Sequence, residues 1–120
     1  MLPQSEICKV NLSRAVAEIP EPFVYGEVGR LNDHMLNVMR SAARTLEFHV
    51  HEESDEMFYV IEGTMRLETD AGFIELGPGD LAIVPRGLRH RPIVAEAVTI
   101  LLVEKAGTLN PGNTGGAYNN

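Results

Sequence analysis

The chain has 120 residues and carries 17 acidic residues against 10 Lys and Arg, for a formal net charge of −7 at pH 7. This length fits one domain, and a composition of 44% hydrophobic and 22% charged residues excludes a globally disordered or collagen-like chain. The acidic balance argues against binding of nucleic acid and against docking on an anionic membrane, because both need a basic surface.

Cysteine usage and hydropathy bear on where the protein works. A single cysteine excludes an intramolecular disulfide, so the fold needs no oxidising compartment. The first residues lack the apolar run of a signal peptide, and no window approaches the roughly 20 apolar residues that span a bilayer. We therefore expect a cytoplasmic protein.

The N-terminal part of the chain predicts short elements. Ile7–Leu12 is a candidate strand, and Ser13–Ile19 predicts one or two helical turns before two closely spaced prolines. Phe23–Val28 is the next predicted strand, and Gly29–Asp33 has the composition of a turn.

From His34 onward, short apolar runs alternate with turn residues. The predicted strands are Met35–Arg40, Thr45–His51, Glu56–Glu62, Thr64–Thr69, Phe73–Leu76, Leu81–Pro85, His90–Val94 and Val98–Glu104. Many short strands with turn signals every 8–12 residues or so indicate an all-β sandwich or barrel. We expect one domain over residues 1–106 and a flexible C-terminal tail over residues 107–120, which is rich in Gly and Asn.

Three of the four histidines and one glutamate form a pattern that suits a metal ion. His49 and His51 are two residues apart in a predicted strand, so their side chains should point to the same face. Glu56 opens the next strand after a short polar connection. His90 is far along the chain, but a barrel can bring a distant strand to the same interior point.

This set of donors indicates a class of metal. Three neutral imidazoles and one carboxylate suit Fe, Mn, Ni, Zn or Cu better than Ca or Mg, and they leave coordination positions open. Taken singly, a His-x-His pair is usually an incidental surface feature, and a glutamate after a turn is usually solvated. The joint pattern, with its glycines and proline, favours metal binding.

Two segments resemble the two sequence motifs of the cupin superfamily. The first motif, Gly-x5-His-x-His-x3–4-Glu-x6-Gly, is matched by His49, His51, Glu56 and Gly63, with Ala43 in place of the first glycine. The second motif, Gly-x5-Pro-x-Gly-x2-His-x3-Asn, is matched by Gly79, Pro85, Gly87 and His90, with Val94 in place of the closing asparagine. Neither replacement falls on a proposed ligand.

The resemblance implies a fold and a range of functions. It covers residues 43–94 by motif, and it implies a double-stranded β-helix, or jelly-roll barrel, of the small single-domain bacterial kind often described as a conserved cupin 2 barrel or as phosphomannose-isomerase-like. Cupins include isomerases, lyases, dioxygenases and non-catalytic binding or sensor domains. The resemblance therefore predicts architecture better than reaction.

Period two in the strands suggests further site residues. If His49 and Glu56 point inward, Glu47, Phe58 and Val60 should do so too. Glu47 would then be a candidate general base or a hydrogen-bond partner of a ligand histidine. Phe58 and Val60 would form either an apolar pocket wall or simply core.

These observations lead to three hypotheses of function, the last of which is a scaffold with no bound metal. The first is a metal-dependent enzyme of isomerase, lyase or dioxygenase type that acts on a small oxygenated metabolite such as a sugar, keto acid or diketone. The second is a non-catalytic module that binds or senses a small molecule. In each case we expect a homodimer, since the N-terminal strands of similar small cupins often join the sheet of a partner and cover its edge.

Overall fold

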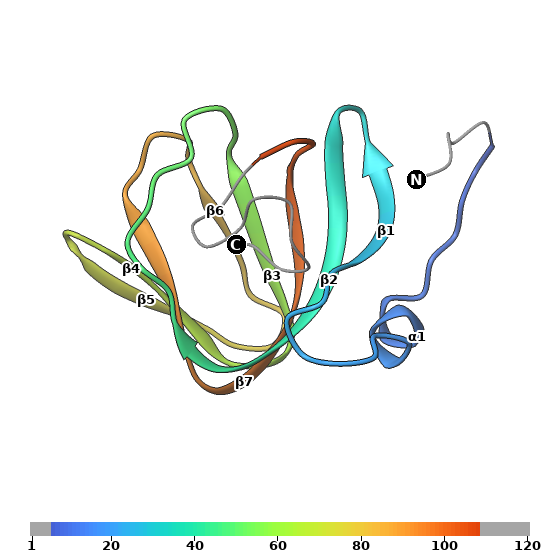
Figure 1. The fold of residues 1–120 in the computed structure, drawn as a ribbon, viewed down its shortest axis with the longest axis horizontal. Helices are drawn as coiled ribbons and strands as arrows, with labels where there is room; N and C mark the ends of the chain where they lie inside the picture. The colour runs from blue at the N-terminus through green and yellow to red at the C-terminus, as the bar shows by residue number, and fades with distance from the viewer. Residues whose placement is uncertain (1–5, 109–120) are drawn as a thin grey trace.

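The computed structural model describes residues 6–108, which form an all-β fold with one short helix (Figure 1). The elements in chain order are α1 (Leu12–Ala17), β1 (Gly26–Leu31), β2 (His34–Thr45), β3 (Glu56–Gly63), β4 (Met65–Thr69), β5 (Gly72–Leu76), β6 (Leu81–Val84) and β7 (His90–Lys105). Nearly all of the predicted C-terminal tail lies outside the described residues.

Helix α1 forms where the sequence predicts helical turns. The side chain of Asn11 accepts a hydrogen bond from the backbone N–H of Arg14 at 3.0 Å, which caps the first turn. The helix ends before Pro20, which cannot continue it. The predicted strand at Ile7–Leu12 is wrong, because its side chains have nothing to pack against: Ile7 is 99% exposed and Leu12 already belongs to the helix.

All strand pairs are antiparallel, and two long strands hold the barrel together. The main path runs β1-β2-β7-β3-β6, while β4 pairs with both β5 and β7. Strand β7 is 16 residues long, and it runs along one side of the barrel and returns along the other (Figure 1). Its first half therefore pairs with β4 and its second half with β3. This arrangement of antiparallel strands is the expected double-stranded β-helix.

Two predicted breaks are corners of continuous strands rather than loops. Strand β2 continues through the break expected at 41–44, and β7 continues through the one expected at 95–97. The two corners lie side by side: Ala42 pairs with Ala97, and Arg44 pairs with Val94 after a register shift. Such a bulge bends a strand sharply while the ladder continues on both sides. The small residues permit the bend, and we had expected them to end the strands.

Other boundaries shift by a few residues. Strand β1 starts later and ends later than predicted, so only residues 32–33 remain as a turn, and its bulge lies between Glu27 and Gly29. The expected strand Thr45–His51 is also wrong in part, since β2 ends at Thr45. Beyond it the chain follows β7 with a single isolated bridge, between His49 and His90.

The barrel interior is packed by alternating side chains. In β3, Glu56, Phe58 and Val60 are buried while their neighbours are half-buried or exposed, as period two requires. The core cluster draws on β2, β3, β4, β5, β6 and both halves of β7. Buried polar residues also occur, and four of them, His49, His51, Glu56 and His90, lie together.

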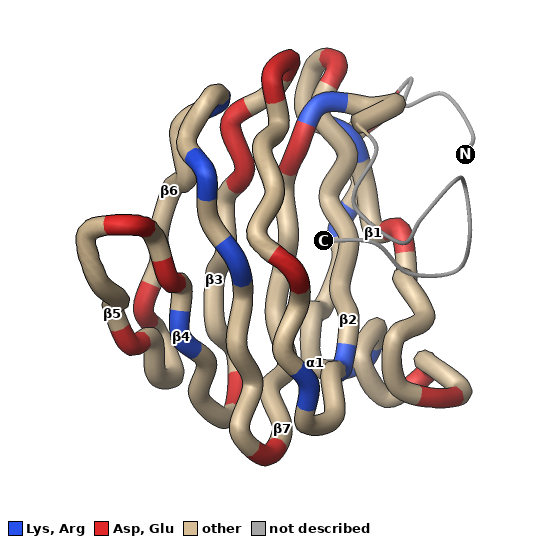
Figure 2. Tube along the Cα trace, turned by 60° about the vertical axis from the view of Figure 1, so that its left-hand side comes forward, with Lys and Arg blue, Asp and Glu red and all other residues tan. Residues whose placement is uncertain are grey.

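Charged residues of both signs lie outside the barrel. Blue and red segments alternate over β4, β5 and the neighbouring half of β7 (Figure 2). Arg91 pairs with Glu68 at 2.6 Å, and Arg66 pairs with Glu75 at 3.2 Å. Among the described residues there is no helix long and apolar enough to cross a membrane.

Candidate metal centre

The backbone brings the two motif segments together before any side chain is considered. His49 and His90 exchange both backbone hydrogen bonds, at 2.9 and 3.0 Å. The N–H of Gly87 donates to the carbonyl of His51 at 2.8 Å, and the N–H of Arg86 donates to Oδ1 of Asp55 at 2.9 Å. These contacts fix the loop before β7 against the segment that follows β2.

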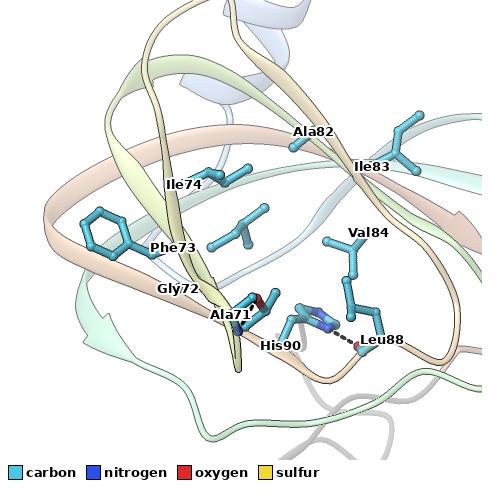
Figure 3. A pocket seen from close by; sticks show the side chains of 11 residues that line it. Ala71, Gly72, Phe73, Ile74, Ala82, Ile83, Val84, Leu88 and His90 are labelled. Atoms are coloured by element: carbon cyan, nitrogen blue, oxygen red, sulfur yellow. Dashed lines mark hydrogen bonds between the residues drawn. The ribbon is translucent and has the colours of Figure 1, made fainter.

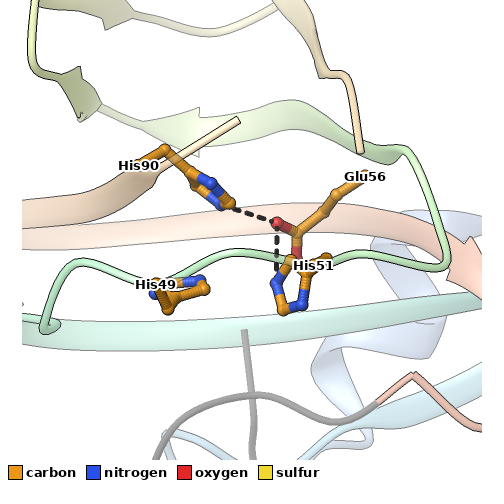
Figure 4. Close-up of side chains that lie close together, drawn as sticks. All are labelled: His49, His51, Glu56 and His90. Atoms are coloured by element: carbon orange, nitrogen blue, oxygen red, sulfur yellow. Dashed lines mark hydrogen bonds and ion pairs between the residues drawn. The ribbon is translucent and has the colours of Figure 1, made fainter. Parts of the chain in front are cut away.

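The four predicted ligands meet inside the barrel. One ligand atom from each of His49, His51, Glu56 and His90 lies within 4.8 Å of the others, and all four residues are buried. The imidazole ring centres of the three histidines are 4.5 to 5.6 Å apart. Figure 4 shows the rings and the carboxylate facing a common point. The i, i+2 argument therefore placed His49 and His51 correctly, and the intervening Val50 points to solvent with 39% exposure.

Hydrogen bonds orient two of the imidazoles. Nδ1 of His49 lies 2.8 Å from the carbonyl of Glu47, and Nδ1 of His90 lies 2.9 Å from the carbonyl of Leu88. A carbonyl only accepts, so each Nδ1 must carry a proton and donate it. In the neutral ring Nε2 then presents its lone pair to the centre of the group, which is the usual arrangement behind metal-ligating histidines.

The carboxylate of Glu56 is the hub of the group. Its Oε1 lies 3.1 Å from Nε2 of His90 and 3.5 Å from Nε2 of His51. Burial alone would raise the pKa of Glu56, but hydrogen bonds and charge interaction with His51 and His90 outweigh it and lower the pKa to about 2. The carboxyl group is therefore ionised at neutral pH.

The histidines respond to the same surroundings in opposite directions. Burial lowers the pKa of His49, and its hydrogen bond to the Glu47 carbonyl only partly offsets this. Burial also tends to lower the pKa of His90, but the hydrogen bond to Glu56 and the contact with the Leu88 carbonyl raise it overall. These shifts favour the ionised form of Glu56, the neutral form of His49 and the protonated form of His90.

Several buried polar atoms fit a bound cation. Within residues 6–108, Nε2 of His49 and Oε2 of Glu56 are buried and have no hydrogen-bond partner. Buried polar groups are rarely left unsatisfied, because desolvation without a partner is costly. A divalent ion between the four residues would satisfy both atoms and neutralise the carboxylate. The donor set therefore could hold a metal ion, and imidazole-rich sets favour transition metals.

Glu47 differs from what we expected. Its side chain is exposed rather than turned into the barrel, because the chain leaves regular strand geometry after Thr45 and period two does not extend back from His49. Its backbone carbonyl, not its carboxylate, contacts the group. A catalytic role for the Glu47 carboxylate stays a prediction.

Phe58 and Val60 point inward as expected, and both are fully buried within the core cluster. Their packing thus supports the reading that they are core residues rather than the wall of a pocket. A cavity of about 250 Å³ does border His90, but its walls come from the β4–β5 hairpin, β6 and Leu88 (Figure 3). A second cavity, of about 440 Å³, borders His51 and is lined by Glu52, Glu53 and Lys105 among others.

Sequence reasoning missed one buried acid near the group. Glu104 is 1% exposed and lies opposite Glu56 in the β3–β7 ladder, so both carboxyl side chains enter the barrel at the same level. It shares the inward phase of Ile100 and Leu102 in β7. That phase was visible in the sequence and would have identified Glu104.

Comparison with known proteins agrees with the fold and the site. Residues 38–104 match the family model described as "Cupin domain". The uncharacterised protein YdbB of Bacillus subtilis is 32% identical over 84 residues, which are 68% of this chain and 72% of that protein. The segment 38–104 that matches the family model contains all four candidate ligands.

Solved structures show the same barrel. A cupin-2 domain protein from Shewanella frigidimarina superimposes with a TM-score of 0.75 at 23% identity, covering 80% of this chain and 93% of the other. A conserved Klebsiella pneumoniae protein with a double-stranded β-helix domain gives a TM-score of 0.65 at 21% identity, covering 85% and 92% of the two chains. Because the family model spans more than half of its residues, the chain belongs to the cupin family.

Proposed function

We propose that the protein is a metal-dependent enzyme. It would bind one divalent transition metal ion, Fe, Mn, Ni, Zn or Cu, through His49, His51, Glu56 and His90. The carrying observation is the buried convergence of these four residues within 4.8 Å. The proposed substrate is a small oxygenated metabolite, such as a sugar, a keto acid or a diketone. The proposed reaction is of isomerase, lyase or dioxygenase type.

The residues of the group define what such a site could do. A bound divalent ion supplies Lewis acidity toward an oxygen atom of a ligand. The one carboxylate of Glu56 leaves a local charge of about +1 on a divalent complex, which favours an anionic oxygen such as a carboxylate or an enolate. The backbone carbonyls behind His49 and His90 hold those rings in place, so that little reorganisation is needed when a ligand binds.

Metal content of the purified chain is the first test. After chelation, the full chain is reloaded separately with Fe(II), Mn(II), Ni(II) or Zn(II), and bound metal is measured by elemental analysis. We expect about one equivalent of at least one metal, and its loss in the His49→Ala/His51→Ala double variant. His34→Ala is the matched control, since His34 lies outside the group and pairs with Asp33. Equal binding by the double variant would exclude the proposed site.

Turnover is the second test. Oxygen uptake and product formation are followed for each metal form with sugars, keto acids and diketones. Turnover that the double variant loses and His34→Ala keeps would support an enzyme. Saturable binding without turnover in every metal form would contradict catalysis and favour a binding or sensor module.

The Glu47 prediction can be tested in the same assay. Glu47→Gln removes the carboxylate but keeps the backbone carbonyl that contacts His49. If the carboxylate is catalytic, this variant should lose turnover while it keeps its metal. Unchanged turnover would refute the role.

A further inference from the structure

The cavity beside His90 lies where the barrel wall is open. Within residues 6–108, strand β5 pairs only with β4 and β6 pairs only with β3, so no ladder between described strands closes the gap between β5 and β6. Ile74 shows the consequence: it lies opposite the buried Leu67, yet it is 53% exposed. Figure 3 shows the β4–β5 hairpin and β6 on the two sides of this opening.

The lining of this cavity is almost entirely apolar. Its inner wall includes Leu67, Ile74, Ala82, Val84 and Leu88, and none of its lining residues is Lys, Arg, Asp or Glu. The hydroxyl of Thr69 already accepts a hydrogen bond from the backbone N–H of Ala71 at 3.1 Å. Polar groups that entered here would lose water and find few partners.

The cavity borders the candidate metal centre at His90. His90 belongs both to the cavity wall and to the four-residue group. Val84, another wall residue, lies directly opposite Glu56 in the β3–β6 ladder. A molecule held by an oxygen atom at the group would therefore lie next to this cavity.

The second cavity has a different character. It borders the group at His51, and its lining includes the charged residues Glu52, Glu53 and Lys105. The two cavities thus offer an apolar and a charged environment next to one group of ligands. A substrate with a polyhydroxylated body would fit the charged side, and one with a hydrocarbon body would fit the side of His90.

We propose that the ligand of this protein combines an oxygen-bearing head, held at the group of His49, His51, Glu56 and His90, with an uncharged apolar arm that fills the cavity between β5 and β6. This inference rests on the proposed function and narrows it to keto acids or diketones with alkyl or aryl arms rather than sugars. The size agrees, since an apolar cavity of about 150 Å³ accommodates benzene and this one measures about 250 Å³.

The test compares chelators that share one head and differ in the arm. The full chain is loaded with Co(II), its metal content is measured, and acetohydroxamate, hexanohydroxamate and gluconohydroxamate are titrated while the visible cobalt spectrum is followed. Each methylene group that leaves water should tighten binding about fourfold. Hexanohydroxamate has four more methylene groups than acetohydroxamate, so we expect it to bind about two-hundredfold more tightly, and we expect gluconohydroxamate to gain nothing.

Variants assign the gain to one cavity. Ala71 is exposed at the rim of the apolar cavity, so Ala71→Trp should block it and abolish the gain of the hexanoyl arm. Ala106→Trp, which fills the charged cavity, is the matched control and should keep the gain. Ile74→Ser gives a second, milder variant on an exposed position and should reduce the gain severalfold.

The outcomes separate the two proposals. Absence of bound metal in the Co(II) form and in the Fe(II), Mn(II), Ni(II) and Zn(II) forms of the first test would refute the proposed function itself. Bound cobalt without any gain from the hexanoyl arm would overturn the inference and leave the metal site standing. A gain lost in Ala106→Trp and kept in Ala71→Trp would also overturn it, because the arm would then occupy the charged cavity.

Discussion

Gly63, at the end of β3, provides a quantitative test of the structure. Its φ of +82° lies in the left-handed region that L side chains rarely adopt. A Cβ atom at this position would overlap the carbonyl oxygen of Ala97 and lie 3.0 Å from Cα of Val98. Both neighbours are backbone atoms at the corner of β7, so they cannot move aside like the end of a flexible side chain. We therefore predict that Gly63→Ala strongly destabilises the fold.

The expected loss of unfolding free energy has two parts, and a substitution at a second glycine can separate them. The left-handed conformation costs about 1–2 kcal/mol for a residue with Cβ, and forcing an atom into a packed position costs about 1–3 kcal/mol more. Gly63→Ala should thus lower the free energy of unfolding by about 3 kcal/mol. Gly79 has a similar φ of +88° but has nothing within 4 Å of a built Cβ. Gly79→Ala should therefore lose only the first part, about 1 kcal/mol.

Urea unfolding measures both losses. The chain has no tryptophan, so far-UV circular dichroism is the suitable signal, and a chelator keeps bound metal from masking the difference. In thermal unfolding, at roughly 4 °C per kcal/mol for a chain of this size, the melting temperature should fall by about 12 °C in Gly63→Ala and by about 4 °C in Gly79→Ala. Equal losses in the two variants would show that Gly63 does not approach the corner of β7 as described.

Three further predictions concern the site and the assembly. Bound metal should be released as the pH falls below about 6, because protons compete for the imidazole nitrogens. The pKa of His90 is raised and that of His49 is lowered, so His90 should take up a proton at a higher pH than His49; metal retained at pH 4 in elemental analysis would contradict imidazole ligation. Asp55→Ala removes the acceptor for the backbone N–H of Arg86. It should therefore lower the free energy of unfolding in urea by about 1 kcal/mol and weaken metal binding, whereas Asp70→Ala at an exposed ion pair should do neither. We also predict a homodimer, with the edge strand β1 as the surface available for pairing, so that sedimentation at micromolar concentration should give twice the 13.2 kDa chain mass; a monomer would refute this.

Local sequence patterns were sufficient for much of the barrel and for the choice of the four residues that meet as candidate metal ligands. Strands β3 to β6 each occupy a short apolar run between turn residues, so alternation and turn chemistry predict them within one or two residues. The ligands were predictable because His49 and His51 differ by two positions and because His90 follows the Pro85–Gly87 turn at a motif spacing. These signals depend on neighbours in the chain.

Features that depend on distant contacts were not predictable in the same way. The residues at 41–44 and 95–97 look like turns by composition, and only their pairing with each other turns them into corners of continuous strands. The orientation of Glu47 depends on where β2 leaves the ladder with β7, which no local pattern specifies. The open wall between β5 and β6 likewise follows from which strands remain unpaired.

The course of β7 explains why fold and site depend on one another. His90 begins this strand and Glu104 lies next to its last residue, yet both are near Glu56, because the strand turns at its corner and returns along the opposite sheet (Figure 1). The distance between His90 and Glu56 is therefore set partly by a bend at the far end of the barrel. Gly63 contacts that bend, so Gly63→Ala should weaken metal binding as well as the fold, although it lies outside the ligand group. Gly79→Ala, which touches no part of β7, should leave metal binding close to that of the unaltered chain.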